Sequence, residues 1–583
     1  MQHRRMFIVC IGVLCGALFS SGLRAKDWPQ WGGQDGRKMV SEEKGLPESF
    51  VPGEKNPQGG GIDLGTTKNV KWVAKLGTMT CSTPAVAGGK VFIGTASEGQ
   101  GVLLCLDEQT GKVLWHLTCP AREVPKVIDG RKFWFSVFPP TLGICSSPAV
   151  DGDRVYVVTH RCEVLCLDVN GLTSGNDGPF QDEKKYASKP SKETGASEAG
   201  EANIVWLFDM WEMGVRPADA CNCSVLVHGD LVYVCTSNGV DRDADASKHD
   251  EFRRTPAPLA PNLIVLEKKT GRLVATDEER IAPRMLHGQW SSPSLGRIGD
   301  KTLVFLGGGD GACYAWEALS SVPERPVKLK KAWSFDCNPP EYKVFGDLDL
   351  VTHYSRGDRR RKDTMIGKND GTFVGMSEII ATPVFHNNRV YVAIGRDPEH
   401  GRGRGALWCL DAGEGASGPS RAVSARKGSG FGVQGSEPGR VGPEGFGVQG
   451  KGIRGQRLGA TEEGSRAIWC YKGLDRTLST VSIADGLLYV ADVAGRLHCL
   501  DADTGRCLWV HETKARIWGS TLVADGKVYL PTEKHLWIFA AGRDKRVLSR
   551  ISLGAPVWAT PIAANGVLYV ASTRYLWAIR AKD

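Results

Sequence analysis

Short apolar segments separated by polar turns recur along most of this chain. In the fullest copy, apolar runs at 479–484, 487–490 and 497–500 precede a fourth run that ends at Trp509. Asp-Gly and Thr-Gly dipeptides separate these runs, and glycine there supplies the positive φ angle that a tight turn needs. The pattern predicts four short antiparallel strands in a unit of roughly 40 residues.

Eight copies of this unit can be followed along the chain, and each begins with a short motif that often contains Ser or Thr before Pro. The motifs are Ser82-Thr83-Pro84, Ser146-Ser147-Pro148, Cys223-Ser224-Val225, Ser291-Ser292-Pro293, Ala381-Thr382-Pro383, Ser479-Thr480-Val481, Ser520-Thr521-Leu522 and Ala559-Thr560-Pro561. One small sheet cannot bury both of its faces, so the copies must pack on one another.

The last copy lacks its fourth strand, whereas Asn69-Val70-Lys71-Trp72-Val73 has the pattern of a fourth strand without the first three. Pairing these two ends closes a ring and removes both exposed sheet edges. We therefore predict an all-β fold: an eight-bladed β-propeller of four-stranded antiparallel blades, closed by an N-terminal outer strand.

The end of the unit carries a specific motif, Leu-x-Cys-Leu-Asp followed by Thr-Gly-Lys/Arg and Trp, as at 103–115 and 497–509. This motif resembles the repeat of the quinoprotein alcohol dehydrogenase-like propellers, the pyrroloquinoline quinone (PQQ)-like repeat family. The resemblance covers nearly everything from Val70 to Ile579, and the Gly-His and Trp-Asp signatures of WD40 propellers are not repeated. Segments 27–32, 287–293 and 397–401 look like those of exported planctomycete-type members.

Residues 1–25 have the pattern of a secretory signal: a basic cluster, an apolar run and then small residues. We expect their removal and export of the mature chain to the periplasm or the medium, without a transmembrane segment. Residues 26–69 form an N-terminal extension, and 70–583 the propeller. The Gly-rich segment 413–466 interrupts the fifth copy, and its composition predicts a flexible insertion. A polar stretch near 177–202 interrupts the second copy at the equivalent turn.

The formal net charge of +8 is small for 583 residues, which argues against a nucleic-acid binder. Cysteine is frequent, and one cysteine recurs at the same apolar strand position in several copies, which indicates core packing. These residues are Cys105, Cys166, Cys313, Cys409 and Cys499. Loop cysteines are the candidates for disulfides, and we expect at most one or two bridges among Cys119, Cys145, Cys162, Cys221, Cys223 and Cys337.

Strand directions alternate within a blade, so the links between blades and the connections from second to third strands emerge on one face. The long links fall there, and quinoproteins of this superfamily seat their cofactor near the axis at that face. Our candidate ligand-binding residues are His287, Gln289, Trp290, Asp336, Asn338, Asp397, Glu399, His400, Arg516 and Trp518. The Asp397–His400 loop could bind a hard cation or transfer a proton. Alternatively, these side chains only tie long loops to the propeller rim.

Three functions are compatible with these observations. The first is a binding or scaffold protein, monomeric, whose loop-rich face holds a protein, peptide or glycan; Phe133-Trp134-Phe135 and Phe138 would then anchor the partner or fill the axial channel. The second, implied by the resemblance, is a PQQ- and Ca²⁺-dependent dehydrogenase of an alcohol or sugar, with Trp290 or Trp518 stacked on the quinone. A hydrolase or lyase acting on polysaccharide is a third, supported only by export and exposed aromatic residues.

We favour the binding protein, without an assigned catalytic residue, for three reasons. The chain has no adjacent Cys-Cys pair of the kind that many PQQ alcohol dehydrogenases place over the quinone. The Glu, Asn and Asp ligands of calcium cannot be matched residue by residue. No haem motif Cys-x-x-Cys-His is present to carry electrons onward.

Overall fold

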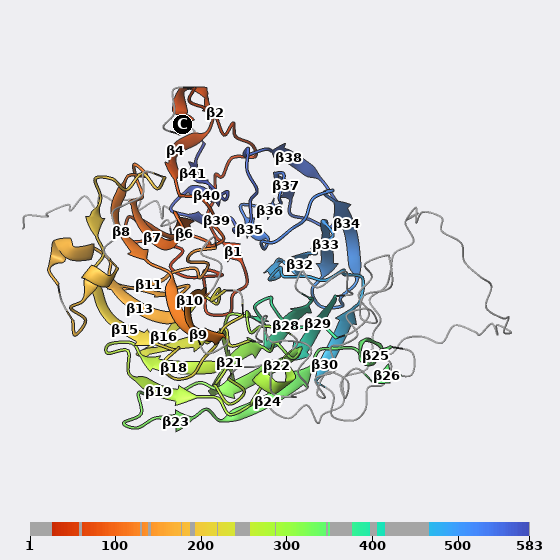
Figure 1. The fold of residues 1–583 in the computed structure, drawn as a ribbon. Helices are drawn as coiled ribbons and strands as arrows, with labels where there is room; N and C mark the ends of the chain where they lie inside the picture. The colour runs from red at the N-terminus through yellow and green to blue at the C-terminus, as the bar shows by residue number, and fades with distance from the viewer. Residues whose placement is uncertain are drawn as a thin grey trace, which may run out of the picture.

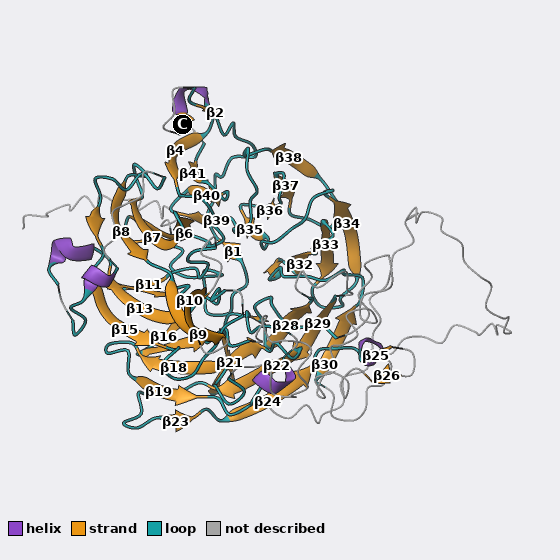
Figure 2. Ribbon diagram, viewed as in Figure 1, coloured by secondary structure: helices purple, strands orange, loops and turns teal. Residues whose placement is uncertain are grey.

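The computed structural model describes residues 26–581 except 58–60, 129–130, 138–141, 177, 187–192, 219, 240–256, 286, 346–347, 350–375, 397–404 and 414–465. Eight small antiparallel sheets stand around a common axis (Figure 1), and nearly all regular structure is β (Figure 2). The chain is an eight-bladed β-propeller. The signal sequence and the Gly-rich insertion that we expected lie outside the described residues.

The first four blades follow one another along the chain, each with its innermost strand first. Blade 1 is β5 (Ala85–Ala87), β6 (Lys90–Ser97), β7 (Gln100–Asp107) and β8 (Val113–Cys119). Blade 2 is β11 (Ala149–Asp151), β12 (Arg154–Val158), β13 (Glu163–Asp168) and β15 (Ile204–Asp209). Blade 3 is β16 (Leu226–His228), β17 (Leu231–Cys235), β18 (Leu263–Glu267) and β19 (Leu273–Thr276). Blade 4 is β20 (Ser294–Ile298), β21 (Lys301–Gly307), β22 (Ala312–Glu317) and β24 (Lys331–Asp336).

The remaining blades complete the ring. Blade 5 is β27 (Val384–His386), β28 (Arg389–Ile394), β29 (Ala406–Asp411) and β30 (Ala467–Tyr471). Blade 6 is β31 (Ser482–Ala484), β32 (Leu487–Ala491), β33 (Arg496–Asp501) and β34 (Cys507–Glu512). Blade 7 is β35 (Leu522–Ala524), β36 (Lys527–Pro531), β37 (Leu536–Ala540) and β38 (Val547–Ile551). Blade 8 is β39 (Ile562–Ala564), β40 (Val567–Ala571), β41 (Tyr575–Ile579) and the N-terminal strand β4 (Val70–Lys75).

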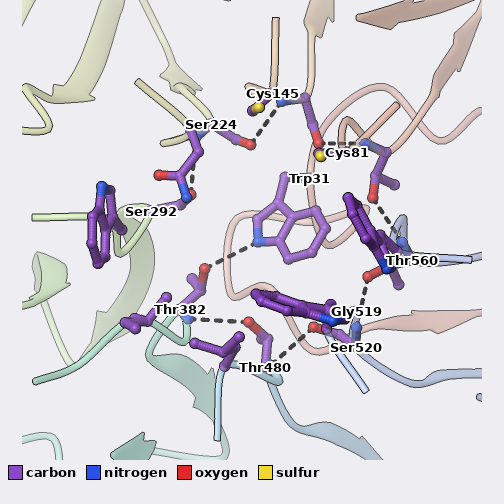
Figure 3. A pocket seen from close by; sticks show the side chains of 18 of the residues that line it. Trp31, Cys81, Cys145, Ser224, Ser292, Thr382, Thr480, Gly519, Ser520 and Thr560 are labelled. Carbon is purple, nitrogen blue, oxygen red and sulfur yellow. Dashed lines mark hydrogen bonds between the residues drawn. The ribbon is translucent and has the colours of Figure 1, made fainter. Parts of the chain in front are cut away.

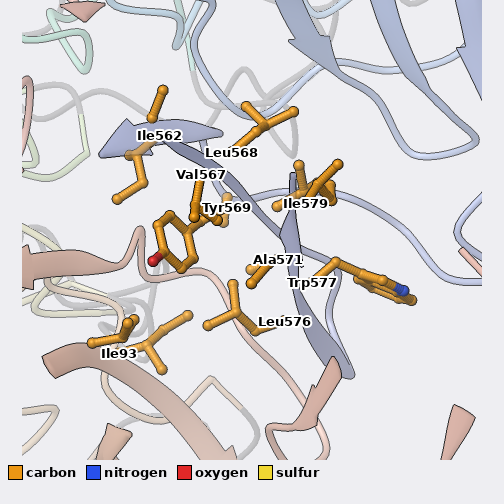
Figure 4. Packing of buried hydrophobic residues seen from close by; sticks show 14 of the residues in the cluster. Ile93, Ile562, Val567, Leu568, Tyr569, Ala571, Leu576, Trp577 and Ile579 are labelled. Carbon is orange, nitrogen blue, oxygen red and sulfur yellow. The ribbon is translucent and has the colours of Figure 1, made fainter. Parts of the chain in front are cut away.

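Strand β4 closes the ring by pairing antiparallel with β41, from Val70 opposite Ile579 to Lys75 opposite Tyr575. The closing blade packs on blade 1 through buried side chains that include Ile93, Tyr569 and Leu576, whereas Trp577 points away from blade 1 (Figure 4). Trp577 is fully buried, and its Nε1 donates to the carbonyl of Pro52 at 3.0 Å. Closure thus joins the two ends of the chain through both backbone pairing and apolar packing.

The repeated Thr-Gly turn and the repeated Trp are explained by contacts between neighbouring blades. Gly505 has φ +68°, and a Cβ atom there would lie 2.6 Å from the indole of Trp469 in the preceding blade. The Nε1 of Trp469 donates to the carbonyl of Ala502 at 3.2 Å. Equivalent bonds join Trp72 to Glu108 (2.9 Å), Trp115 to Val169 (2.9 Å), Trp206 to Lys268 (3.0 Å), Trp333 to Ala412 (3.1 Å) and Trp509 to Gly542 (3.1 Å). The motif therefore encodes the docking of one blade on the next.

Residues 26–41, here called the N-terminal strap, run around the hub and bond to the inner strands of most blades. Trp28 and Val86 exchange two backbone hydrogen bonds of 2.9 Å. The backbone N–H groups of Val150, Leu295, Phe385, Ile483 and Val523 donate in turn to the carbonyls of Pro29, Asp35, Gly36, Lys38 and Met39. The strap ends in β1 (Val40–Ser41), which pairs parallel with β35. These contacts lie at the ends of the inner strands opposite the blade-to-blade links.

Arg37 of the strap is fully buried within the hub. Its guanidinium donates to the carbonyls of Trp31, Pro293 and Val225, the last two at 3.1 and 2.9 Å. Burial lowers the pKa of Arg37 to about 10, and the nearby Asp35 carboxylate opposes that effect. The side chain therefore remains a cation at neutral pH and ties the strap to blades 3 and 4.

Smaller elements decorate the propeller. They are β2 (Glu54–Lys55), β3 (Ile62–Asp63), β9 (Arg122–Ile128), β10 (Arg131–Val137), β14 (Gly200–Glu201), β23 (Val327–Lys328), β25 (Val344–Phe345), β26 (Leu348–Asp349) and the 3₁₀ turns η1 (Leu64–Thr66), η2 (Gly171–Ser174), η3 (Glu183–Lys185), η4 (Ala282–Arg284) and η5 (Pro340–Tyr342). In the 177–202 insertion, β14 extends blade 1 by pairing parallel with β8. Glu193 of that insertion accepts from Ser97, at a turn between second and third strands. The insertion therefore reaches around blade 1 toward the face of the long links. The alternation of strand directions had predicted that it would stay on the opposite face.

The cysteines repeated in the strands are buried as expected, but the bridges expected among the other six do not form, and those six are buried as well. Cys105, Cys166, Cys313, Cys409 and Cys499 are buried in the apolar strand positions. Every cysteine that the structure describes is free, including all six bridging candidates. Within the described residues, no helix is long and apolar enough to cross a membrane.

Candidate binding cavity

A cavity of about 570 Å³ lies on the propeller axis, lined by side chains from all eight blades (Figure 3). Two rings of residues form its wall, at positions two residues apart in each blade, because alternate residues of an extended strand point to the same side. The ring nearer the inner strands, called the hydroxyl ring, is Thr83, Ser147, Ser224, Ser292, Thr382, Thr480, Ser520 and Thr560. The ring nearer the blade-to-blade links, called the entrance ring, is Cys81, Cys145, Asn222, Trp290, Ile380, Leu478, Trp518 and Trp558.

Hydrogen bonds run around the hydroxyl ring from blade to blade (Figure 3). The backbone N–H of Thr83 donates to Ser147 Oγ at 3.1 Å, and that of Ser147 to Ser224 Oγ at 3.1 Å. The same bond links Ser224 to Ser292 (2.9 Å), Thr382 to Thr480 (3.0 Å), Thr480 to Ser520 (2.9 Å), Ser520 to Thr560 (2.9 Å) and Thr560 back to Thr83 (3.1 Å). Each of these bonds crosses a blade boundary, so the ring helps to hold the propeller closed.

This bonding determines the chemistry that the ring offers to a ligand. A hydroxyl has one donor hydrogen and can accept through its oxygen. The ring oxygens are occupied as acceptors, while none of their hydrogens has an acceptor among the described residues. The cavity is therefore rich in hydrogen-bond donors at this level.

Trp31 of the strap forms the floor of the cavity and lies inside the hydroxyl ring (Figure 3). Its Nε1 donates to Oγ1 of Thr382 at 3.0 Å. Because the strap bonds to the inner strands on the side away from the links, the cavity is closed by the protein's own N-terminal segment at that end. A ligand would enter through the entrance ring.

Three indoles contribute most of the aromatic surface of the entrance ring. Trp518 and Trp558 form a tilted pair with ring centroids 5.8 Å apart. Trp518 Nε1 donates to Glu533 at 2.8 Å, and Trp290 Nε1 donates to the carbonyl of Ala218 at 3.2 Å. The indole nitrogen of Trp558 is buried and has no hydrogen-bond partner among the described residues. Trp558 thus adds one more donor without an acceptor.

Two thiols lie side by side in the entrance ring. Strand register brings them together, because Ser82 Oγ donates to the carbonyl of Ser146 at 3.0 Å in the adjacent blade. The pKa of the Cys145 thiol is raised well above its ordinary value, through its contact with Cys81 and through burial. The Cys145 thiol is therefore protonated at neutral pH. No acidic or basic residue lines the described cavity.

Of the three predicted site residues just before blade 4, only one lines the cavity. Trp290 lines the cavity, with His287 against it at a centroid distance of 4.8 Å and an interplanar angle of 88°. His287 and Gln289 are buried and do not line it. Gln289 accepts from Gly309 N–H at 2.8 Å and donates to the carbonyl of Gly307. Gln289 therefore bonds the end of the preceding link to the turn between the second and third strands of blade 4.

The other predicted residues lie apart from one another. Trp518 lines the cavity, while Arg516 is exposed. Asn338 is buried and exchanges hydrogen bonds with the backbone of Ser377, and Asp336 accepts from the backbone of Asn338 at 2.9 Å. Asp397, Glu399, His400 and Phe138 lie outside the described residues. The side chains of Phe133–Phe135, in the β9–β10 hairpin, are likewise outside what the structure describes.

Sequence reasoning missed the hydroxyl ring, Trp31 and Trp558. The repeated Ser and Thr residues before the inner strands predict strand starts, but the repeat alone does not show that their hydroxyls line one cavity. Trp31 belongs to the 27–32 segment, which was used only for the family resemblance. The signal that could have found the ring is a polar side chain repeated once per blade at a strand start next to the axis.

A family model matches two parts of the chain. A family described as outer membrane protein assembly factor BamB matches residues 62–173 and 454–544. No curated protein matches the chain at a significant level.

Solved structures are similar at low sequence identity. BamB from Moraxella catarrhalis has 11% identity and a TM-score of 0.45, covering 88% of this chain and 99% of its own. A europium-containing methanol dehydrogenase has 12% identity and a TM-score of 0.47, covering 94% and 89%. Quinohemoprotein alcohol dehydrogenase from Comamonas testosteroni has 13% identity and a TM-score of 0.40, covering 96% and 81%. The family match confirms the resemblance to the PQQ-like propeller repeat family. It spans β4, blade 1, most of blade 2, blade 6 and much of blade 7.

Proposed function

We propose that this chain is an exported binding protein whose ligand occupies the axial cavity, entering from the face of the long links. The observation that supports this most is the uncharged, donor-rich wall of the cavity, closed at one end by Trp31. A volume of about 570 Å³ is within the range of small-molecule and cofactor sites. Export rests on the pattern of residues 1–25.

The wall suits a ligand that offers hydrogen-bond acceptors and a flat or apolar face. The hydroxyl ring supplies donors, and the indoles of Trp290, Trp518 and Trp558 supply aromatic surface. Aromatic side chains contribute large contact areas, and buried donors that gain an acceptor on binding favour the complex.

The alternative function, a PQQ- and calcium-dependent dehydrogenase, fits this cavity less well. The indoles and hydroxyls would suit a planar quinone, but PQQ carries carboxylate groups that need cationic partners or a metal ion. No lining residue is charged, and the described residues contain no group of three His, Cys, Asp or Glu side chains that could hold a metal ion. The described residues therefore do not supply the charged partners that PQQ and calcium need, and we derive no redox step through that pair.

A blocked-cavity variant tests the proposal. Asn222 belongs to the entrance ring and makes only a weak contact with the Cys223 thiol, so Asn222→Trp places an indole at the cavity entrance with little other change. We expect tryptophan emission of the mature protein to respond saturably to at least one member of a panel of oligosaccharides and short peptides, and Asn222→Trp to abolish that response. A panel that produces no saturable response, or a response that persists in Asn222→Trp, would contradict the axial site.

A further inference from the structure

A second hollow of about 860 Å³ lies beside the axial cavity, between blades 7, 8 and 1. Its wall includes the link 552–556, the turn at Arg574 and the start of the link after β4, all on the same face as the entrance ring. Trp558 lines both hollows. The two spaces are therefore neighbours on one face and share a side chain whose indole nitrogen has no partner among the described residues.

The second hollow differs from the axial cavity in charge. Lys55, Lys75 and Arg574 line it, with Glu193 as the acidic side chain of its wall. None of the three cations forms an ion pair with any described residue. Lysine and arginine that are already paired contribute little to a ligand, whereas unpaired cations beside a hollow attract anionic groups.

We propose that the ligand is an acidic oligosaccharide that spans both hollows. One sugar would lie in the axial cavity, and carboxylate-bearing sugars would lie in the second hollow, here called the cationic groove. This inference rests on the proposed function, because it places the end of the ligand in the axial site. Sugar rings present several oxygen acceptors and a flat C–H face, which match the hydroxyl donors and the indoles. An extended peptide offers about one carbonyl acceptor per residue, so it matches the donor ring less well.

The cations of the second hollow predict that acidic sugars bind more tightly than neutral ones. Lys75 is half-buried at the end of β4, and Arg574 is exposed in the turn that opens β41. A carboxylate between them would gain charge-assisted hydrogen bonds, while a neutral sugar would not. Exposed pairs are screened by salt, so the preference for the acidic sugar weakens as ionic strength rises.

The experiment compares three probes by calorimetry: a uronic-acid oligosaccharide, a neutral oligosaccharide of the same length, and an acidic peptide. The groove variant is Lys75→Gln/Arg574→Gln. Its matched control is Lys112→Gln/Arg506→Gln, which removes the same charges from exposed turns between third and fourth strands of blades 1 and 6. The cavity variant is Asn222→Trp.

We expect the acidic oligosaccharide to bind most tightly and the groove variant to weaken it by about 10-fold, as two exposed ion pairs would. The control should bind like the wild type, Asn222→Trp should abolish binding, and the neutral oligosaccharide should be indifferent to the groove variant. Equal affinity for acidic and neutral probes would overturn the inference while leaving the axial site intact. Tighter binding of the acidic peptide, or binding that survives Asn222→Trp, would also overturn it. Binding of none of the three probes, or binding that survives Asn222→Trp, would contradict the proposed axial site itself, whereas loss of the acidic preference alone contradicts only this inference.

Discussion

The Nε1 of Trp31 donates to Oγ1 of Thr382 over 3.0 Å, joining residues that are 351 positions apart in the sequence. The other bonds of the hydroxyl ring that we describe come from backbone N–H groups of neighbouring blades, whereas at Thr382 the donor is a side chain of the strap. The strap is therefore part of the hub, because it both closes the cavity and supplies one of the hydrogen bonds of its wall.

This relationship predicts a separable effect of two substitutions at Trp31. Trp31→Phe keeps an aromatic floor but removes the donor, so the free energy of unfolding should fall by about 1 kcal/mol, the usual net value of a hydrogen bond. Trp31→Ala also removes the floor, and should lose about 2–4 kcal/mol more. Urea unfolding measures both. Equal losses in the two variants would show that the indole contributes only its hydrogen bond.

The docking of one blade on the next predicts that the loss of stability on replacing a glycine depends strongly on where that glycine lies. Gly505→Ala puts a methyl group 2.6 Å from the Trp469 ring at a φ of +68°, and should cost about 3 kcal/mol of unfolding free energy. Gly486→Ala is the matched control in the same blade, with φ +72° and nothing within 4 Å of the added carbon. Its cost should be about 1 kcal/mol, from backbone strain alone.

Chemical denaturation of these two variants gives the comparison directly. A loss at Gly505 no larger than that at Gly486 would mean that the Trp469 indole moves aside without penalty, contrary to the docking described here.

A third prediction concerns pH. His228 Nδ1 lies 3.3 Å from Asp35 Oδ2 of the strap, and this hydrogen bond raises the pKa of His228 while burial opposes it. For Asp35, burial raises the pKa, but hydrogen bonds from His228 and Gln30 and the charge of Arg37 outweigh it and lower the pKa overall. Because the folded pKa of His228 is raised, its contribution to stability is complete below about pH 6.5 and is lost as the pH rises through the folded value.

The Asp35 contribution is present above about pH 3.8 and is lost as the pH falls through its lowered folded value. The interaction between His228 and Asp35 therefore stabilises the fold most between about pH 3.8 and about pH 6.5. Thermal melting of the wild type and His228→Asn should differ more at about pH 5.5 than at about pH 8.5. Both side chains are more than one third exposed, so the difference should be small and should shrink in high salt. A difference that grows with pH would show the opposite linkage.

Much of the fold could be predicted because its signals are local and repeated. Trp469 and Gly505 belong to one motif, and that motif marks both the turn and the contact between blades. Ring closure by β4 could also be predicted, since Trp72 matches the repeated outer-strand position.

The features that could not be predicted depend on contacts that do not repeat along the sequence. Backbone atoms of the strap, such as the carbonyls of Asp35 and Met39, bond to the inner strands, and backbone bonding carries no side-chain pattern. The hydroxyl ring was visible as repeated Ser and Thr, yet its chemistry follows only from closure of the ring, which brings Thr560 beside Thr83. His287 and Gln289 have the residue types of a site, but in the folded chain they lie behind Trp290 and outside the lining.

The central claim is that the axial cavity binds its ligand without a quinone cofactor. The most direct measurement is gel filtration of the purified mature protein after incubation with PQQ at saturating Ca²⁺, followed by quinone absorbance and by dye reduction with a panel of alcohols and sugars. We predict that no quinone is retained and no dye is reduced, because the lining residues supply no charge to hold the cofactor. Stoichiometric retention with turnover would contradict the account and assign the chain to the quinoprotein dehydrogenases.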